Sequence, residues 1–165
     1  MTQKIYPRSP YQRLGGYVHL PRLIDKARLH RCGLLHGYNY KTSGFDQHLL
    51  SFLGIDGDEF ERMASELSSD EAMLAWIRTK AKIHTPAEID AWNAAMINRE
   101  PETPEKISLF KRLLAKAGGA DRSFQVRTYF DLIELEEGRF KPDVMAEPAS
   151  AMGGVGRVAL LRDRG

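Results

Sequence analysis

A run of polar and aromatic residues between two predicted helices is the clearest place for chemistry in this sequence. Tyr38, Tyr40, Lys41, Thr42 and Ser43 stand there, directly before a helix expected to begin near Phe45. Free backbone amides at a helix start, together with an ammonium group and hydroxyls, can hold a phosphate, sulfate or carboxylate. We therefore expect a small anionic ligand, or the acidic surface of a partner, at this loop. The simpler alternative is that Ser43 only caps the helix and that the Lys41 ammonium is solvated.

Residues outside the loop could extend such a site. Arg8, Arg22 or Arg28 could hold the same anion with a guanidinium fork. Asp46 or His48 could act as a general base, with Tyr38 or Tyr40 as the proton donor. These roles would make the chain a small hydrolase or transferase, which is the alternative to a binding or regulatory domain.

We expect neither a metal ion nor a cofactor. His30, Cys32 and His36 are types of residue that bind zinc, but His30 and Cys32 are two residues apart at a helix end and point to different faces. Cys32 is then expected to be a small buried hydrophobic residue. Residues 154–159 resemble a dinucleotide-binding fingerprint, but too few residues follow for a βαβ unit.

The charge is unevenly distributed along the chain. Residues 1–44 contain eight Lys or Arg and one acid, Asp25, whereas residues 45–139 contain eighteen Asp or Glu and twelve Lys or Arg. This bias suggests that the basic N-terminal residues bind an anion. Alternatively, the basic and acidic parts pack near each other and each reduces the electrostatic field of the other. We expect Asp25 to pair with Arg22 or Arg28, and residues 134–137 to form a solvated acidic edge. Nucleic-acid binding is a third alternative and is disfavoured, because the net charge is only +2 and no recognised module is present.

The elements that would position these residues are predicted from helix-start and helix-stop signals. A mainly α fold is expected, an irregular bundle of about seven short helices with little or no sheet, over residues 1–140, followed by a loose tail over 141–165. Only residues 123–127 and 155–161 have much β character. The expected helix boundaries are Ser9-Pro10 to Gly15-Gly16, Leu20-Pro21 to Gly33, Ser43 to Gly54, a start at Asp56 or Asp58, a capping box from Ser68 to Glu71, and starts at Thr85, Thr103 and Thr128.

Composition favours a cytoplasmic globular protein. The chain has 165 residues and a single cysteine, so an intramolecular disulfide is impossible and a reducing compartment is indicated. The apolar runs are too short for a transmembrane helix, and we predict no membrane association. The composition leaves the oligomeric state open.

Several segments resemble, in order, those of a bacterial protein family. They are Pro7-Arg8-Ser9-Pro10, Gly15-Gly16, the stretch from Leu20 to Arg28, Asp46, the stretch from Phe52 to Asp56, and Ala91-Trp92-Asn93. The chain is similar over roughly residues 7 to 137 to the family catalogued as domain of unknown function 5069. The resemblance implies a small stand-alone bacterial protein and supplies no activity, cofactor or catalytic residue.

Overall fold

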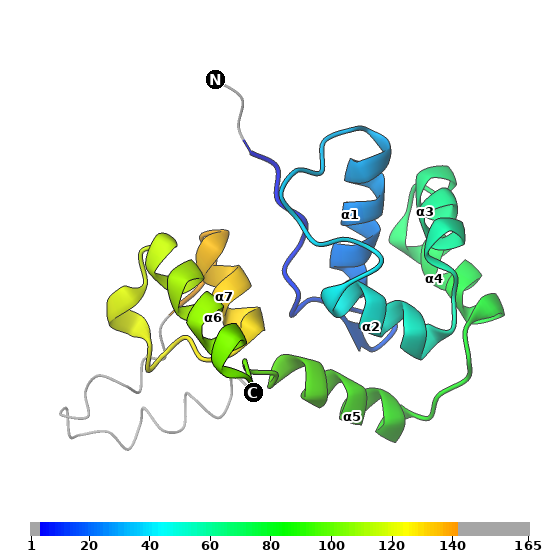
Figure 1. The fold of residues 1–165 in the computed structure, drawn as a ribbon. Coiled ribbons are helices and arrows are strands. Elements are labelled where there is room, and N and C mark those ends of the chain that lie inside the picture. Colours follow the sequence, from blue (N-terminus) through cyan, green and yellow to red (C-terminus); the bar gives the residue numbers. More distant parts are fainter. Residues whose placement is uncertain (1–3, 142–165) are drawn as a thin grey trace, which may run out of the picture.

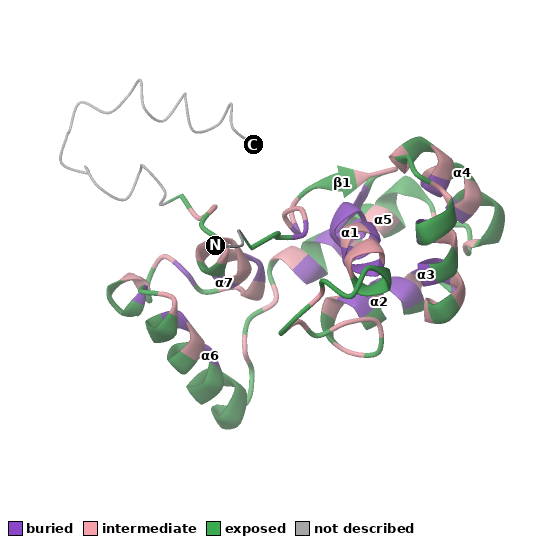
Figure 2. Ribbon diagram, turned by 90° about the horizontal axis from the view of Figure 1, so that it is seen from above, coloured by how far each residue is buried: buried purple, intermediate pink, exposed green. Residues whose placement is uncertain are grey.

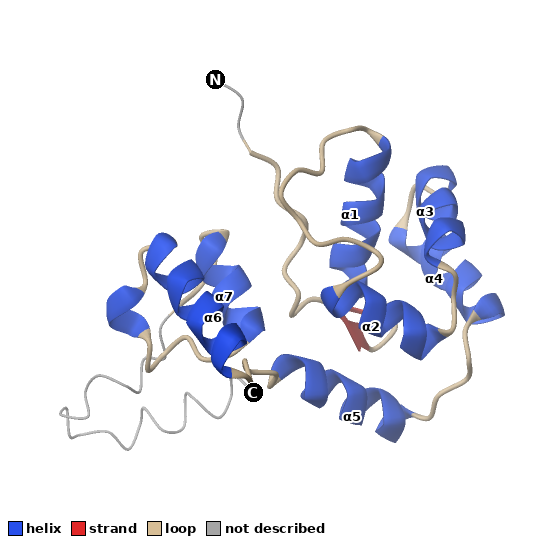
Figure 3. Cartoon of the chain, viewed as in Figure 1, coloured by secondary structure: helices blue, strands red, loops and turns tan. Residues whose placement is uncertain are grey.

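The structure is a computed structural model that describes residues 4–141. This part of the chain forms seven α-helices, one short 3-10 helix and one two-stranded sheet (Figure 3), which confirms the predicted mainly α fold with little sheet. In chain order the elements are β1 (Arg13–Leu14), β2 (Tyr17–Val18), α1 (Leu20–Arg31), α2 (Gly44–Leu53), α3 (Gly57–Glu66), α4 (Asp70–Lys80), α5 (Pro86–Ile97), α6 (Pro104–Lys116), η1 (Ala120–Arg122) and α7 (Tyr129–Glu136).

The segment from Ser9 to Gly16 does not form the expected helix. Arg13 pairs with Val18 and Leu14 with Tyr17 in an antiparallel hairpin. Gly15 and Gly16 form its two-residue turn with φ of 61° and 91°, and two consecutive positive φ angles are what a tight primed hairpin turn requires. The glycine pair that suggested a helix end is therefore a hairpin turn.

The other helix boundaries lie close to their predicted positions, because local caps define them. Asp56, Thr85, Thr103 and Thr128 each accept a hydrogen bond from a backbone N–H in the first turn of their helix. One cap is shifted by a residue, since Ser69 rather than Ser68 caps α4. Residues 123–127 form turns and loop instead of a strand.

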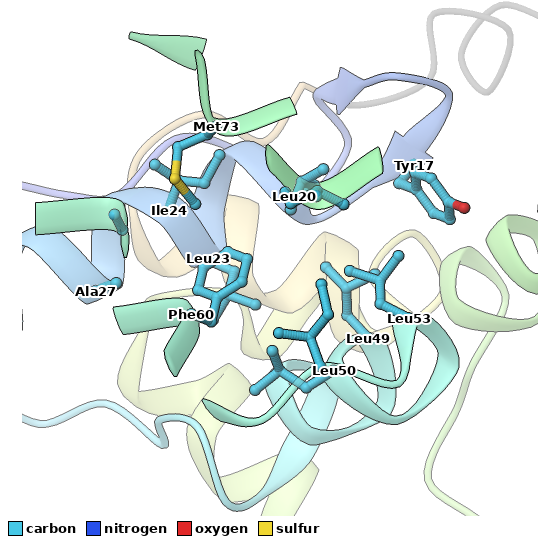
Figure 4. Packing of buried hydrophobic residues seen from close by; sticks show 13 residues of the cluster. Tyr17, Leu20, Leu23, Ile24, Ala27, Leu49, Leu50, Leu53, Phe60 and Met73 are labelled. Atoms are coloured by element: carbon cyan, nitrogen blue, oxygen red, sulfur yellow. The ribbon is translucent and has the colours of Figure 1, made fainter. Parts of the chain in front are cut away.

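The main core lies between the first four helices and the hairpin. Figure 4 shows the inner side chains of α1 facing those of α2, α3 and α4. Each fully buried leucine contributes about 2 kcal/mol of hydrophobic stabilisation. The core consists of Tyr17, Leu20, Leu23, Ile24, Ala27, Leu49, Leu50, Leu53, Ile55, Phe60, Ala64, Met73 and Ile77.

A smaller core joins α6 to α7. Phe110 and Leu114 of α6 pack with Val126 and with Leu132 of α7. Figure 1 places this pair at one end of the molecule and α3 and α4 at the other, with α1 and α2 between them. Figure 2 shows buried residues concentrated on α1 and its neighbours, whereas α6 is largely exposed. A third cluster, formed by Val18 of β2, Met96 of α5 and Phe130 of α7, packs α7 against the rest of the molecule.

No helix in residues 4–141 is both long enough and apolar enough to cross a bilayer. The expected tail, the β-like residues 155–161 and the fingerprint-like residues 154–159 lie outside the described residues, apart from residue 141.

Candidate functional site

Asp46, in the first turn of α2, is the centre of a buried polar cluster. Its side chain is only 1% exposed. One carboxylate oxygen lies 2.7 Å from Nε2 of His19, and the other lies 2.9 Å from Nζ of Lys26 and accepts the backbone N–H of Lys41 at 3.0 Å. Asp46 thus joins the start of α1, the middle of α1 and the loop before α2.

His19 is placed by an unusual backbone conformation. It is the N-cap of α1, with a left-handed φ of 71°, and its N–H bonds to the carbonyl of Pro10. The imidazole is buried beside the rings of Phe45 and Phe130. Because a helix turns once every 3.6 residues, His19, Arg22 and Lys26 lie along one side of α1.

Burial and charge together define the protonation states in this cluster. Burial lowers the pKa of His19, although hydrogen bonding to Asp46 opposes that shift. Burial also lowers the pKa of Lys26 despite its ion pair with Asp46. Burial alone would raise the pKa of Asp46, but His19, Lys26 and the Lys41 amide outweigh it, so the pKa is lowered. We therefore assign a neutral imidazole that donates from Nε2, which leaves Nδ1 as an acceptor without a partner.

A second buried ion pair adjoins the first along α1. The two terminal nitrogens of Arg22 donate to the Glu137 carboxylate at 2.9 and 2.7 Å, and the side chains are 3% and 4% exposed. Arg139 also donates to Glu137 and pairs with Glu134. The prediction that residues 134–137 form a solvated edge is wrong for Glu137, because the end of α7 packs against α1.

Tyr38 lies over these two ion pairs. Its ring centroid is 5.7 Å from the guanidinium carbon of Arg22, 5.8 Å from Nζ of Lys26 and 5.6 Å from Nζ of Lys4. The hydroxyl is buried and has no hydrogen-bond partner within 3.5 Å, although the Glu137 carboxylate lies close to it. Burial, with a further contribution from the nearby Glu137 carboxylate, raises the pKa of Tyr38 to about 12. The phenol is therefore protonated and able to donate.

Three of the predicted site residues are engaged by α3 instead. Arg28 donates from Nε to the carbonyl of Ala64 and from Nη2 to that of Leu67, at the end of α3. The hydroxyl of Tyr40 donates to Glu61 at 2.7 Å. The ammonium of Lys41 lies 2.7 Å from Asp58 and 3.4 Å from Glu61.

The remaining predicted residues lie apart from the buried cluster. Thr42 is exposed, and Ser43 occupies the N-cap of α2 without forming a side-chain cap bond. His48 is partly buried, and burial together with the charge of Arg99 lowers its pKa. Of the predicted set, Asp46 directly accepts the backbone N–H of Lys41, and Tyr38 lies near Asp46 through Lys26.

Sequence reasoning missed His19, Lys26 and Glu137, and it offered Arg22 only as one of three alternative arginines for the anion. The available signal was the spacing of His19, Arg22 and Lys26, which is that of one helix face. Nothing local indicated the partner on α7. Asp25 pairs with Arg8, not with Arg22 or Arg28 as expected.

Within the described residues, no group of three or more His, Cys, Asp or Glu side chains is arranged to hold a metal ion. Cys32 is exposed, so the expectation that it is buried is wrong. The thiol follows the last turn of α1, at the surface.

Comparison with known families gives a match over most of the chain. Residues 4–139 match the family described as "Domain of unknown function (DUF5069)". No curated protein sequence matches the chain.

Proposed function

The chain belongs to the DUF5069 family, and we propose that it is a binding domain that holds a small anionic ligand beside Tyr38. The observation that carries this proposal is the buried Tyr38 hydroxyl, which lacks a partner although three cationic side chains surround its ring. A buried hydroxyl without a hydrogen bond is costly, and a ligand oxygen would satisfy it.

The charges around Tyr38 favour an anion. Lys26 and Arg22 are each compensated by one buried carboxylate, Asp46 and Glu137. Lys4 contacts the rings of Tyr6 and Tyr38 and forms no ion pair with a carboxylate in residues 4–141. A carboxylate or phosphate could accept from the Tyr38 hydroxyl and from the Lys4 ammonium together.

This proposal keeps the expected ligand class but moves its position. The loop before α2 was expected to bind an anion through Lys41, and Asp58 and Glu61 now neutralise that ammonium. The basic N-terminal third instead contributes Lys4, Arg22 and Lys26.

Titration calorimetry with inorganic phosphate and with acetate tests the proposal. We expect native protein to bind at least one of them, and Tyr38→Phe to weaken binding by about tenfold or more, since a hydrogen bond to a charged group is lost. Tyr11→Phe is the matched control, because it removes a hydroxyl that bonds to Asp131 instead. Absence of binding to the native protein, or equal weakening in both variants, would overturn the proposal.

An acid–base enzyme is the second candidate, and the observation that favours it is the unpartnered Nδ1 of His19. A carboxylate that orients a neutral histidine is a common arrangement for a general base. The sequence suggested Asp46 or His48 as the general base; in the enzyme proposed here His19 is the base and Asp46 orients it. Turnover of nitrophenyl esters or phosphates that is lost in His19→Asn and kept in His48→Asn would support it, and no turnover by native protein would reject it for those substrates.

As part of the same proposal we place the protein in the bacterial cytoplasm. The single exposed thiol of Cys32 supports a reducing compartment.

A further inference from the structure

The segment that carries Tyr38 is bounded by two glycines in left-handed conformations. Gly37 has φ of 78° and Gly44 has φ of 64°. A side chain added at Gly37 would meet nothing within 4 Å, and one added at Gly44 would only just reach Asn39. Residues 38–43, called the strap below, thus lie between two positions with open surroundings where backbone rotation is easy.

The strap is fastened near its middle. The hydroxyl of Tyr40 bonds to Glu61, and the ammonium of Lys41 bonds to Asp58. The N–H of Lys41 bonds to Asp46 at the centre of the buried cluster. All three fastening points are side chains of α2 or α3, so the strap is held from outside and not by its own structure.

The backbone at the fastening point is strained. Lys41 has φ of 64°, and the N–H of Thr42 bonds to the carbonyl of Tyr40 across it. A three-residue turn with positive φ at a residue other than glycine is rare and costs free energy. Strain of this kind persists only where surrounding contacts hold it, so release of those contacts favours an open strap.

We propose that the strap is a movable lid that carries Tyr38, with Gly37 and Gly44 as hinges and Lys41 as the latch. This inference rests on the proposed function, since the hydroxyl that would bind the ligand is buried and moves with the strap. The strap is closed in both the free and the bound protein, and opening limits how fast the ligand enters and leaves.

Hydrogen exchange of the free protein tests the lid without any ligand. The amides of Lys41 and Thr42 are hydrogen-bonded in the closed strap. We expect Lys41→Ala and Asp58→Asn, which release the same ion pair from its two ends, to raise exchange at residues 41 and 42 by about two- to fivefold, with α2 unchanged. Lys80→Ala is the matched control, because Lys80 pairs with Glu59 of α3 and does not touch the strap. No change in the strap, or an equal rise throughout α2, would overturn the lid.

Stopped-flow binding of phosphate gives the second measurement. We expect Lys41→Ala to raise the association and dissociation rates by the same factor, so that the dissociation constant is unchanged. A changed dissociation constant with an unchanged association rate would mean that Lys41 contacts the ligand and is no latch. If native protein does not bind phosphate or acetate, the proposed function fails, and the hydrogen-exchange result alone decides whether the strap opens.

Discussion

The guanidinium of Arg22 donates two hydrogen bonds to the carboxylate of Glu137, which lies 115 residues further along the chain. Arg22 lies on α1 and Glu137 is the C-cap of α7, so this pair connects α1 to the end of α7. Both side chains are almost fully buried. In such surroundings the attraction between the two charges offsets the cost of removing them from water, and one charge left alone is strongly destabilising.

Removal of Glu137 should therefore be costly. We expect Glu137→Ala to lower the free energy of unfolding by about 3 kcal/mol or more, because Arg22 remains charged and buried without its partner. Urea unfolding followed by circular dichroism measures the change. Glu66→Ala is the control, since Glu66 forms an exposed pair with Arg62 and its loss should cost less than about 1 kcal/mol. Similar losses in the two variants would contradict the role given to Glu137.

Stability should fall as the pH drops from 7 to 5. Burial lowers the pKa of His19 below its ordinary 6.5, so the unfolded chain binds a proton that the folded protein does not. A lowered folded-state pKa gives stability that is present above the unfolded pKa and is lost as the pH falls. For this one group, the loss reaches up to about 1.4 kcal/mol per pH unit.

Urea midpoints at pH 7, 6 and 5 measure this slope. We expect His19→Asn to have a shallower slope than the native protein, since asparagine does not titrate and tolerates the left-handed backbone at this position. His36→Asn, at an exposed histidine outside the cluster, should keep the native slope. An unchanged slope in His19→Asn would mean that His19 binds a proton in the folded state.

The sequence predicted those features that depend on residues close together along the chain. Thr85 and Thr103 cap their helices as expected, because a cap needs only the next three residues. Tyr38 and Asp46 were predicted as site residues because both lie in or next to the same loop, eight positions apart. The partner of Arg22 was missed because a pairing across 115 residues leaves no local pattern.

The hairpin at Gly15 and Gly16 could not be predicted for a different reason, because its local sequence is compatible with two structures. A glycine pair suits a helix end and a two-residue turn equally well, since both require positive φ. The choice depends on tertiary contacts, and β2 packs against α5 through Asn93, whose amide bonds to both Val18 and Gly16.

The backbone strain at Lys41 can be measured by comparing two substitutions. Lys41→Ala and Lys41→Gly both lose the ion pair with Asp58, but only glycine adopts φ of 64° without strain. We expect Lys41→Gly to be more stable than Lys41→Ala by about 1 kcal/mol in urea unfolding. Equal stability, or a more stable alanine variant, would show that the turn is relaxed.

The helix starts at Ser43 and Thr85 should respond differently to loss of the hydroxyl. Thr85 accepts the N–H of Glu88, and the Glu88 carboxylate accepts the N–H of Thr85, which forms a reciprocal capping box. Ser43 stands at the same position before α2, but its hydroxyl accepts no hydrogen bond from the helix. We expect Thr85→Ala to lower the free energy of unfolding by about 1 kcal/mol and Ser43→Ala to change it by less than about 0.5 kcal/mol. Urea unfolding of both variants provides the measurement, and Thr103→Ala, at another capped start, should resemble Thr85→Ala. A loss of about 1 kcal/mol in Ser43→Ala would instead show that its hydroxyl caps α2 in solution, as the sequence alone suggested.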